Sequence, residues 1–414
     1  MTEQSNCDSG VPKSMIGTAE TRWSVVWIAF GAGVVASMQI GKLPPSMLLV
    51  KAEFEAGFVA AGWIASMIST TGFILGLVSG SIVDHLGHRK VLIFGLCALA
   101  LGSLLGALAP SIEFMLLARF IEGVGFASTT VAGGAMIARE SSDQDRKWAL
   151  GVWAAYMPVG FAGMMMITAA LLDQIGWRAI WVANTAIATI WVSIVLAGTT
   201  KTNLVGRGNN IKTSLVHNIG VVLSQRGALL VAATYALYAA QHIGMMTWLP
   251  TLMQETYSAP ALLAAAVTAA VLIFNGLGNY VAAWSMARDI PIWILLTVGC
   301  IVMALMEAAV FLSPIPDSLR ILCILFFGIA GGLVPASALA AVPTLAPSPA
   351  FIGLVGGLMV MATNTGQLFG APILAWARVF TGSWEGTAYV LIGMATVATL
   401  CALTSRTSES CKLT

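Results

Sequence analysis

The sequence predicts an all-α integral membrane protein in which twelve transmembrane helices form two pseudo-symmetric six-helix halves. Three observations support this prediction: the composition, the length of the apolar segments, and one long polar stretch near the middle of the chain. Apolar residues make up 58% of the chain and charged residues only 9%, with a mean hydropathy of +0.88. Soluble proteins carry roughly 25% charged residues. So few charges cannot cover a water-facing surface, and the chain therefore belongs in a bilayer.

The apolar residues are grouped in runs long enough to cross a membrane as helices. A transmembrane barrel would instead show alternating segments of about ten residues. We expect six spans in the first half, at Trp23–Leu43, Phe58–Ile82, Val91–Ala109, Ile112–Ala138, Trp148–Leu172 and Trp177–Gly198. The second half repeats the number, at Gly227–Leu252, Leu262–Ala287, Pro291–Leu312, Leu319–Val342, Phe351–Trp376 and Thr387–Ser405.

Polar segments set the expected boundaries of the two halves. We expect an N-terminal tail (1–22), an N-terminal half (23–198), a linker (199–226), a C-terminal half (227–405) and a C-terminal tail (406–414). Two halves with equal numbers of spans indicate an internal duplication. The tail before the first span is polar, which does not fit a cleavable signal peptide, so the first helix is expected to be the targeting signal.

The positions of the basic residues predict the orientation. With both termini in the cytoplasm, fourteen bases fall on the inner side: Lys13, Arg22, Arg89, Lys90, Arg139, Arg146, Lys147, Lys201, Arg207, Lys212, Arg226, Arg288, Arg406 and Lys412. The outer side holds five: Lys42, Lys51, Arg178, Arg320 and Arg378. This excess follows the positive-inside rule and favours cytoplasmic termini.

Several classes of function are disfavoured by what the sequence lacks. The six cysteines stand singly, which supports neither a disulfide scaffold nor a zinc site. The sequence contains no HExxH, GxSxG or P-loop motif, so an embedded enzyme or an ATP-driven pump is a poor interpretation. A channel is disfavoured because no selectivity-filter loop repeats. We therefore expect no cofactor and no metal.

The loop between the second and third spans reads GSIVDHLGHRK, with the spacing Gly80-x3-Asp84-x2-Gly87-x-Arg89-Lys90. It resembles the signature loop of the major facilitator superfamily in its glycines, its acid, its basic pair and its position in the chain. His85 departs from the pattern, because the family usually has a base directly after the acid. The corresponding loop of the second half is degenerate, with Ala282 in place of the acid. The intact loop is expected to act as a cytoplasmic gate.

The resemblance implies a monomeric secondary active transporter that works by alternating access in a bacterial inner membrane. Its expected partners are a small organic or anionic solute, protons as coupling ion and the lipid bilayer, with no nucleic acid. The segments LPPSMLLV and TNTGQLFGAPILAWARVFTGSW are also loosely similar to the cyanate-type branch of small-anion carriers. A proton-driven exporter of drugs or of secondary metabolites, such as siderophores or antibiotics, is the alternative.

Small residues recur on the second span. Gly72, Gly76 and Gly80 are spaced four apart, which places them on one helical face that permits close packing. The resemblance implies that this face meets the other half. Static packing within its own half is the alternative.

Ionisable residues within the apolar runs of the first half are candidates for solute binding or proton coupling. Arg119 and Glu122 are three residues apart on the fourth span, so they can form an ion pair on one helical face. This pair either couples transport or only locks the half together. Lys42 would add to a positive cavity if it faced inward, but we expect its side chain to extend to the membrane surface.

The loop after the fourth span contains Arg146 in a second group of charges, which resembles a cytoplasmic charge cluster of the family. It is expected either to meet Asp84 in a gate on the inner face or to anchor the loop at the lipid headgroups.

Polar residues within the spans of the second half are the remaining candidates. They are Tyr235, Tyr238, His242, Asn275, Asn279, Asn364 and Gln367. Polar groups are costly in lipid, so these side chains should face the bundle interior. They either line a central cavity or form interhelical hydrogen bonds. His242 is expected to titrate near neutral pH and to help couple protons, whereas Glu307 lies too near an outer end to be a strong candidate.

Overall fold

The computed structural model describes residues 20–78, 83, 86–199 and 215–410, and throughout these ranges the regular structure is helical. The helices of the first half are α1 (Trp23–Gly41), α2 (Leu43–Glu53), α3 (Phe58–Ser66), the 3₁₀ turn η1 (Met67–Ser69), α4 (Thr70–Leu75), α6 (His88–Ala107), α7 (Ile112–Glu140), α8 (Arg146–Ala154) and α9 (Tyr156–Gly198). The remaining helices are α10 (Leu215–Leu223), α11 (Arg226–Tyr257), α12 (Ala261–Met286), α13 (Ile292–Leu312), α14 (Asp317–Ala340), α15 (Val342–Leu345), η2 (Pro349–Phe351), α16 (Ile352–Thr381) and α17 (Glu385–Ser410).

The described residues contain 11 helical runs that are long and apolar enough to cross a membrane. The longest run, Arg146–Gly198, turns at Gly176, where φ is 73° and a glycine is favoured. Its two limbs correspond to the fifth and sixth predicted spans. The prediction of an all-helical, twelve-span membrane protein is therefore confirmed.

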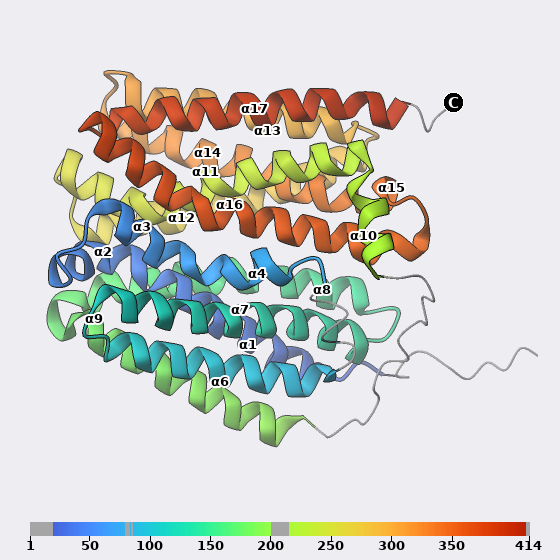
Figure 1. Ribbon diagram of the computed structural model, residues 1–414, viewed down its shortest axis with the longest axis horizontal. Helices are drawn as coiled ribbons and strands as arrows, with labels where there is room; N and C mark the ends of the chain where they lie inside the picture. The colour runs from blue at the N-terminus through green and yellow to red at the C-terminus, as the bar shows by residue number, and fades with distance from the viewer. Residues whose placement is uncertain (1–19, 79–82, 84–85, 200–214, 411–414) are drawn as a thin grey trace, which may run out of the picture.

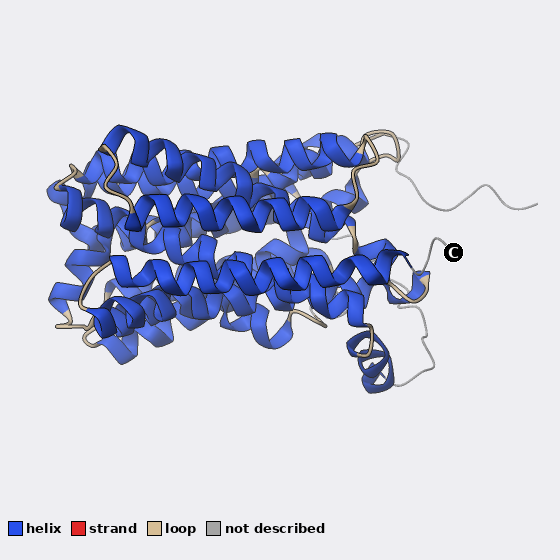
Figure 2. Cartoon of the chain, turned by 90° about the horizontal axis from the view of Figure 1, so that it is seen from above, coloured by secondary structure: helices blue, strands red, loops and turns tan. Residues whose placement is uncertain are grey.

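The helices form two bundles that lie side by side (Figure 1). The N-terminal bundle contains α1 to α9, and the C-terminal bundle contains α11 to α17. Figure 2 shows the long helices running in nearly the same direction. We call the end of the molecule that carries α10 the linker end, and the end that carries α2 the far end.

The first span breaks at Lys42, between α1 and α2. Pro44 and Pro45 follow within three residues, and a proline nitrogen cannot donate the next helical hydrogen bond. The hydroxyl of Ser46 donates to the carbonyl of Lys42 at 2.9 Å, which satisfies an acceptor at the break. The interruption is slight, because Lys42 itself has helical dihedral angles, with φ −70° and ψ −27°, and α2 continues the span to Glu53.

The second span consists of α3, η1 and α4, and it packs against α16 of the other bundle. A Cβ built on Gly62 would lie 2.9 Å from the Cα of Pro372, and one on Gly72 would lie 2.2 Å from the side chain of Asn364. A Cβ on Gly76 would lie 2.8 Å from the amide nitrogen of Met361. Gly72 and Gly76 thus face the other bundle, as the resemblance implied, whereas Gly80 lies outside the described residues.

A glycine of α16 contributes to the same contact between the bundles: a Cβ built on Gly357 would lie 2.6 Å from the carbonyl oxygen of Leu77. We call the surface formed by Gly62, Gly72, Gly76 and Gly357 the glycine seam. Along it the backbones of the two bundles approach directly. Elsewhere the bundles meet where α2 contacts α11 and where α9 contacts α12.

Candidate functional site

Three ionisable side chains meet inside the N-terminal bundle. Lys42 Nζ lies 2.6 Å from Glu122 Oε1, and Arg119 Nη1 bonds to the other oxygen of the same carboxylate. All three side chains are at most 1% exposed. We call these residues the ion triad. Each buried charge would cost roughly 2.5 to 3.5 kcal/mol on membrane-insertion scales, so mutual pairing is what makes the group tolerable there.

The expectation that Lys42 extends to the membrane surface is wrong. Its ammonium donates to Gln39 Oε1 at 2.6 Å and to Ser103 Oγ at 2.8 Å, as well as to Glu122. It also lies 4.6 Å from the ring centroid of Trp181. All three donors of the ammonium are used. The span does not end at Leu43 as predicted but continues as α2 to Glu53, so Lys42 lies inside it.

The guanidinium of Arg119 is held by backbone carbonyls as well as by Glu122. Nε donates to the carbonyl of Ile64 at 3.0 Å, and Nη1 donates to that of Gln39 at 2.9 Å. Nη2 is buried and has no hydrogen-bond partner among the described residues. Two cations and one carboxylate leave the ion triad with a net charge of +1.

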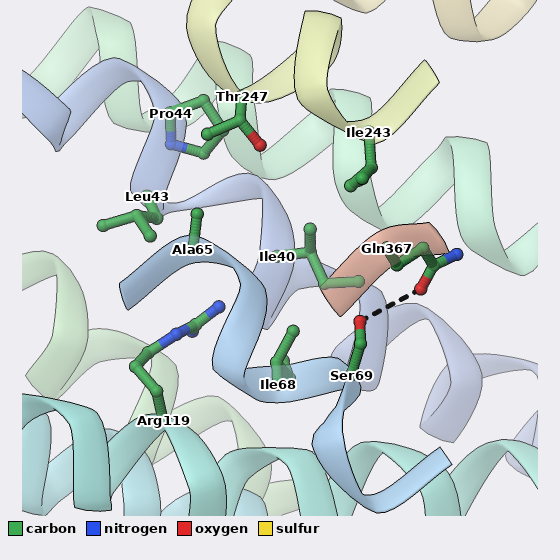
Figure 3. A pocket seen from close by; sticks show the side chains of 10 residues that line it. All are labelled: Ile40, Leu43, Pro44, Ala65, Ile68, Ser69, Arg119, Ile243, Thr247 and Gln367. Atoms are coloured by element: carbon green, nitrogen blue, oxygen red, sulfur yellow. Dashed lines mark hydrogen bonds between the residues drawn. The ribbon is translucent and has the colours of Figure 1, made fainter. Parts of the chain in front are cut away.

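A small pocket lies where Arg119 meets the C-terminal bundle (Figure 3). Its lining comes from both bundles: Ile40, Leu43, Pro44, Ala65, Ile68, Ser69 and Arg119 from the first, and Ile243, Thr247 and Gln367 from the second. Ser69 Oγ donates to Gln367 Oε1 at 3.1 Å, so one hydrogen bond joins the bundles across the pocket. The free space suffices for about one water molecule, so a solute requires the bundles to separate.

The predicted polar residues of α11 and α12 form a neutral ladder in the C-terminal bundle. The rings of Tyr235 and Tyr238 stack at 6.1 Å, and the ring of His242 follows Tyr238 at 5.5 Å. Asn275 donates to the hydroxyl of Tyr238 at 3.0 Å, and Asn279 donates to the carbonyl of Asn275 at 2.9 Å. We call these five residues the neutral ladder. It does not line the pocket between the bundles, so a solute contact by these residues stays a prediction.

The two predicted residues of α16 have different surroundings. Asn364 donates to the carbonyl of Val360 at 2.8 Å and lies against Gly72 on the glycine seam. Gln367, one turn further along, lines the pocket. Among the polar residues predicted in the C-terminal bundle, Gln367 is therefore the one that lines the same pocket as Arg119 of the ion triad.

The gate prediction rests partly on residues outside the described part of the chain, since Gly80 and Asp84 both lie there. Gly87 has φ 89° and precedes the first residue of α6. Arg89 donates to the carbonyls of Thr199 and Leu196, each at 3.1 Å, and so joins α6 to the end of α9. This contact lies within one bundle.

The other two bases predicted for the gate are Lys90, which follows Arg89, and Arg146, in the second group of charges. Lys90 is exposed. Arg146, the first residue of α8, pairs with Asp143 at 2.8 Å and donates to the carbonyl of Ala138 in α7 at 3.0 Å, both within the N-terminal bundle. A gate role for these bases stays a prediction.

A second charged group, which the sequence did not reveal, joins the two bundles at the far end. Phe58 of α3 lies between two cations, with Lys51 Nζ at 3.5 Å and Arg378 Cζ at 3.8 Å from its ring centroid. Glu255 accepts from Arg378 at 2.9 Å and from Trp384 at 3.0 Å. We call these five residues the end cluster. Burial lowers the pKa of Lys51; the nearby Glu255 opposes this shift and Arg378 adds to it.

Glu307 is a further buried acid. It lies five residues before the end of α13, it is fully buried, and neither carboxylate oxygen has a hydrogen-bond partner among the described residues. Its place near the end of a span therefore does not give it access to water. Nothing in the described residues connects it to the pocket.

Comparison with known proteins identifies the family. Residues 29–350 match the Major Facilitator Superfamily. The chain belongs to this superfamily. Its fold and family are those of multi-pass membrane transporters rather than of enzymes. Two solved superfamily structures share the fold: a bacterial homologue of the human lysosomal transporter Spinster in an inward-facing, unoccupied conformation, and a mutant of the nucleoside transporter NupG.

Both structures are 15% identical to this superfamily member, each with a TM-score of 0.78. The alignment with the Spinster homologue covers 94% of this chain and 98% of the other, and the one with NupG covers 92% and 99%. Among curated relatives, the probable nitrate/nitrite antiporter NarK1 of Thermus thermophilus is 25% identical over 92% of this chain and 90% of its own. The multidrug efflux pump LfrA of Mycolicibacterium smegmatis is 27% identical over 43% of this chain and 35% of its own.

Proposed function

We propose that this superfamily member is a proton-coupled secondary transporter that moves a small anion through a site between the two bundles. One observation carries the proposal: the ion triad has a net charge of +1, and Arg119 Nη2 lacks a partner among the described residues at a pocket lined by both bundles. A buried cationic donor without a partner is costly, and an anion entering the pocket supplies that partner. The full-length similarity to a probable nitrate/nitrite antiporter supports an anionic solute.

In the proposed alternating-access cycle, each contact between the two bundles has a role. The end cluster closes the far end, and the hydrogen bond between Ser69 and Gln367 joins the bundles at the pocket. We propose that the protein lies in a bacterial inner membrane with the linker end in the cytoplasm, and the positive-inside rule supports this orientation. Opening then alternates between the far end, outside the cell, and the linker end, where the loop with Asp84 acts as a cytoplasmic gate.

Proton coupling is assigned to Glu122. A proton on this carboxylate raises the charge of the ion triad from +1 to +2, because Lys42 and Arg119 both lose their counterion. The pocket then attracts an anion more strongly, so a proton and an anion load together. Unloading the proton restores the pairs and releases the anion. No other acid of the described residues contacts Arg119.

The test is flux into proteoliposomes with an imposed pH gradient, for a panel of nitrate, nitrite, small carboxylates and cationic dyes. We expect gradient-driven uptake of an anion by the wild type, and at least a tenfold loss in Arg119→Gln. Arg139→Gln, a change at another arginine of α7, is the control and should keep the flux. Anion flux that is unchanged in Arg119→Gln, with normal insertion, overturns the proposal.

A proton-driven exporter of drugs is the second candidate, because LfrA and related multidrug pumps match part of the chain. Such a pump would move the cationic dyes of the panel, and its transport would not need Arg119 Nη2. Dye flux without anion flux therefore favours the exporter.

A further inference from the structure

We propose that the C-terminal bundle binds one anionic phospholipid, with the phosphate at Arg406 and an acyl chain in a groove between α13 and α17. This site lies on the outer surface of the bundle, away from the proposed solute site between the bundles. Two observations on the same pair of helices support it: an apolar groove along the two helices, and an arginine over a tryptophan ring at their linker end.

The groove lies on the outside of the C-terminal bundle and has a volume of about 210 Å³. Its two helices pack side by side along the edge of the molecule (Figure 1). The lining residues are Ile301, Ala304 and Leu305 of α13 and Thr396, Thr399 and Leu400 of α17. Leu305 is 59% exposed and Leu400 is 58% exposed, so the groove opens away from the bundle interior. On a spanning helix such a surface faces the lipid chains.

The polar residues of the groove use their hydroxyl protons within their own helix. Thr396 donates to the carbonyl of Ile392 at 2.7 Å. Thr399 donates to the carbonyl of Ala395, also at 2.7 Å. The other four lining side chains are hydrocarbon. The lining therefore has no free donor for a hydrophilic ligand, whereas an acyl chain fits it without leaving a hydrogen bond unmade.

An arginine lies at the linker end of the same two helices. Arg406 of α17 is exposed, and its Cζ lies 5.1 Å from the ring centroid of Trp293, near the start of α13. A guanidinium over an indole ring keeps its positive charge and the N–H edge that binds phosphate in a bidentate way. Tryptophan is itself enriched at the depth of the lipid headgroups. This pair therefore fits the level of a headgroup.

The spacing between the pair and the groove fits the length of a phospholipid. Ile301 and Leu305 follow Trp293 by eight and twelve residues, which corresponds to about 12 and 18 Å along the helix. One leaflet contributes about half of the roughly 30 Å hydrocarbon core, and its headgroups lie outside that layer. A lipid with its phosphate at Arg406 thus has its chain at the depth of the groove.

The charge of the headgroup decides which lipid fits. Phosphatidylglycerol has a phosphate and no cation, so its charge complements Arg406. Phosphatidylcholine carries its own cation beside the phosphate, which weakens that attraction. Arg288 provides a matched control, because its Cζ lies 3.4 Å from the ring centroid of Trp284 at the same end of the molecule. These two residues belong to the end of α12 and do not line the groove.

The first experiment is native mass spectrometry of the purified full-length transporter, which gives the dissociation constant of the first bound lipid. The probes are palmitoyl-oleoyl phosphatidylglycerol, phosphatidylcholine with the same chains, and glycerol phosphate, which has the charge without the chains. We expect phosphatidylglycerol to bind at least about tenfold more tightly than either other probe. Arg406→Gln should weaken its binding about tenfold, and Arg288→Gln should leave it within about twofold.

The second experiment fills the groove. Ala304→Phe places a ring between the two helices, and we expect it to weaken phosphatidylglycerol binding about tenfold because the chain loses its contacts. Ala283→Phe, at an exposed alanine of α12, is the control and should leave binding unchanged. The same spectra report whether the transporter is a monomer or a dimer.

Each outcome supports or overturns the lipid site. Equal binding of phosphatidylcholine overturns the role of charge, and equal binding of glycerol phosphate indicates a phosphate site that does not use the groove. Unchanged phosphatidylglycerol binding in Arg406→Gln or in Ala304→Phe overturns the proposal. A dimer that disappears in Ala304→Phe would mean that a second copy of the chain occupies the groove. The readout is lipid binding rather than flux, so failure here leaves the proposed function standing.

Discussion

The ion triad and the neutral ladder place polar groups inside an apolar bundle in two different ways. The ion triad gathers two cations of the N-terminal bundle around one carboxylate, and one nitrogen of Arg119, Nη2, has no partner among the described residues. The neutral ladder of the C-terminal bundle is built from tyrosine, histidine and asparagine side chains, which meet through ring stacking and amide hydrogen bonds. The ion triad therefore concentrates charge, while the neutral ladder provides uncharged polar groups.

The two arrangements differ in the free energy that is lost when one partner is removed. Removing one member of a buried ion pair leaves an uncompensated charge and costs about 3 to 5 kcal/mol. Removing one interhelical hydrogen bond in a membrane costs about 0.6 kcal/mol. The ion triad is thus a cooperative unit that one proton or one anion can change, whereas the neutral ladder tolerates small changes. This asymmetry is the reason for placing coupling in the N-terminal bundle.

The largest expected effect comes from Glu122→Gln. The change keeps the shape of the side chain but leaves Lys42 and Arg119 without their shared counterion. We expect the free energy of unfolding to fall by about 3 to 5 kcal/mol. Thermal unfolding in detergent measures it, and Glu113→Gln, at an exposed acid on the same helix, is the control. Equal unfolding temperatures for the two variants would show that the ion triad is not a cooperative unit.

An intermediate effect is expected at the end cluster, which is charged like the ion triad but partly exposed. Glu255→Gln weakens the bonds that position Arg378 and Trp384. Both of these side chains contact Phe58 of the N-terminal bundle, so we expect the change to favour opening of the far end by about 1 kcal/mol. That free energy corresponds to a roughly fivefold rise in the open population. The measurement is alkylation of Ala65→Cys, a pocket position, by an impermeant reagent in a background without the native cysteines.

The control for this measurement is Glu385→Gln, because Glu385 is an exposed acid at the same end. It should leave the alkylation rate unchanged. A rate in Glu255→Gln that matches the control would mean that the end cluster does not hold the far end closed.

The smallest effect is expected in the neutral ladder. Tyr238→Phe removes the hydroxyl that accepts from Asn275, and we expect a loss of about 0.6 kcal/mol in the free energy of unfolding. Tyr280→Phe, at a tyrosine on the surface of α12, is the control. A loss in Tyr238→Phe as large as that in Glu122→Gln would contradict the comparison between the two bundles.

The sequence predicted the architecture well because the thickness of a bilayer fixes the length of a spanning helix. It also predicted that Arg119 and Glu122 meet, since residues three apart share a helical face. The prediction for Lys42 was wrong because the first span was expected to end at Leu43. The helix continues as α2 to Glu53, so Lys42 lies inside the span and is fully buried.

The end cluster could not be predicted from the sequence. More than a hundred residues separate Phe58 from Glu255 and Glu255 from Arg378. They meet only because the start of α3 lies beside the ends of α11 and α16. The helix that Gly72 and Gly76 face could not be predicted from the spacing either, because four-residue spacing defines a helical face but not its neighbour. Both contacts depend on tertiary packing.

The glycine seam has a consequence for how this transporter can evolve. At Gly62, Gly76 and Gly357 its contacts are with backbone atoms of the other bundle, and at Gly72 the contact is with the side chain of Asn364, so its shape is set largely by the main chain and by the absence of side chains at these glycines. The pocket beside it is shaped by side chains such as Ile68 and Ile243. Substitutions in the pocket can therefore alter which solute is accepted without changing the surface on which we propose the bundles move. Mechanical function and solute choice are in this way separable traits of one chain.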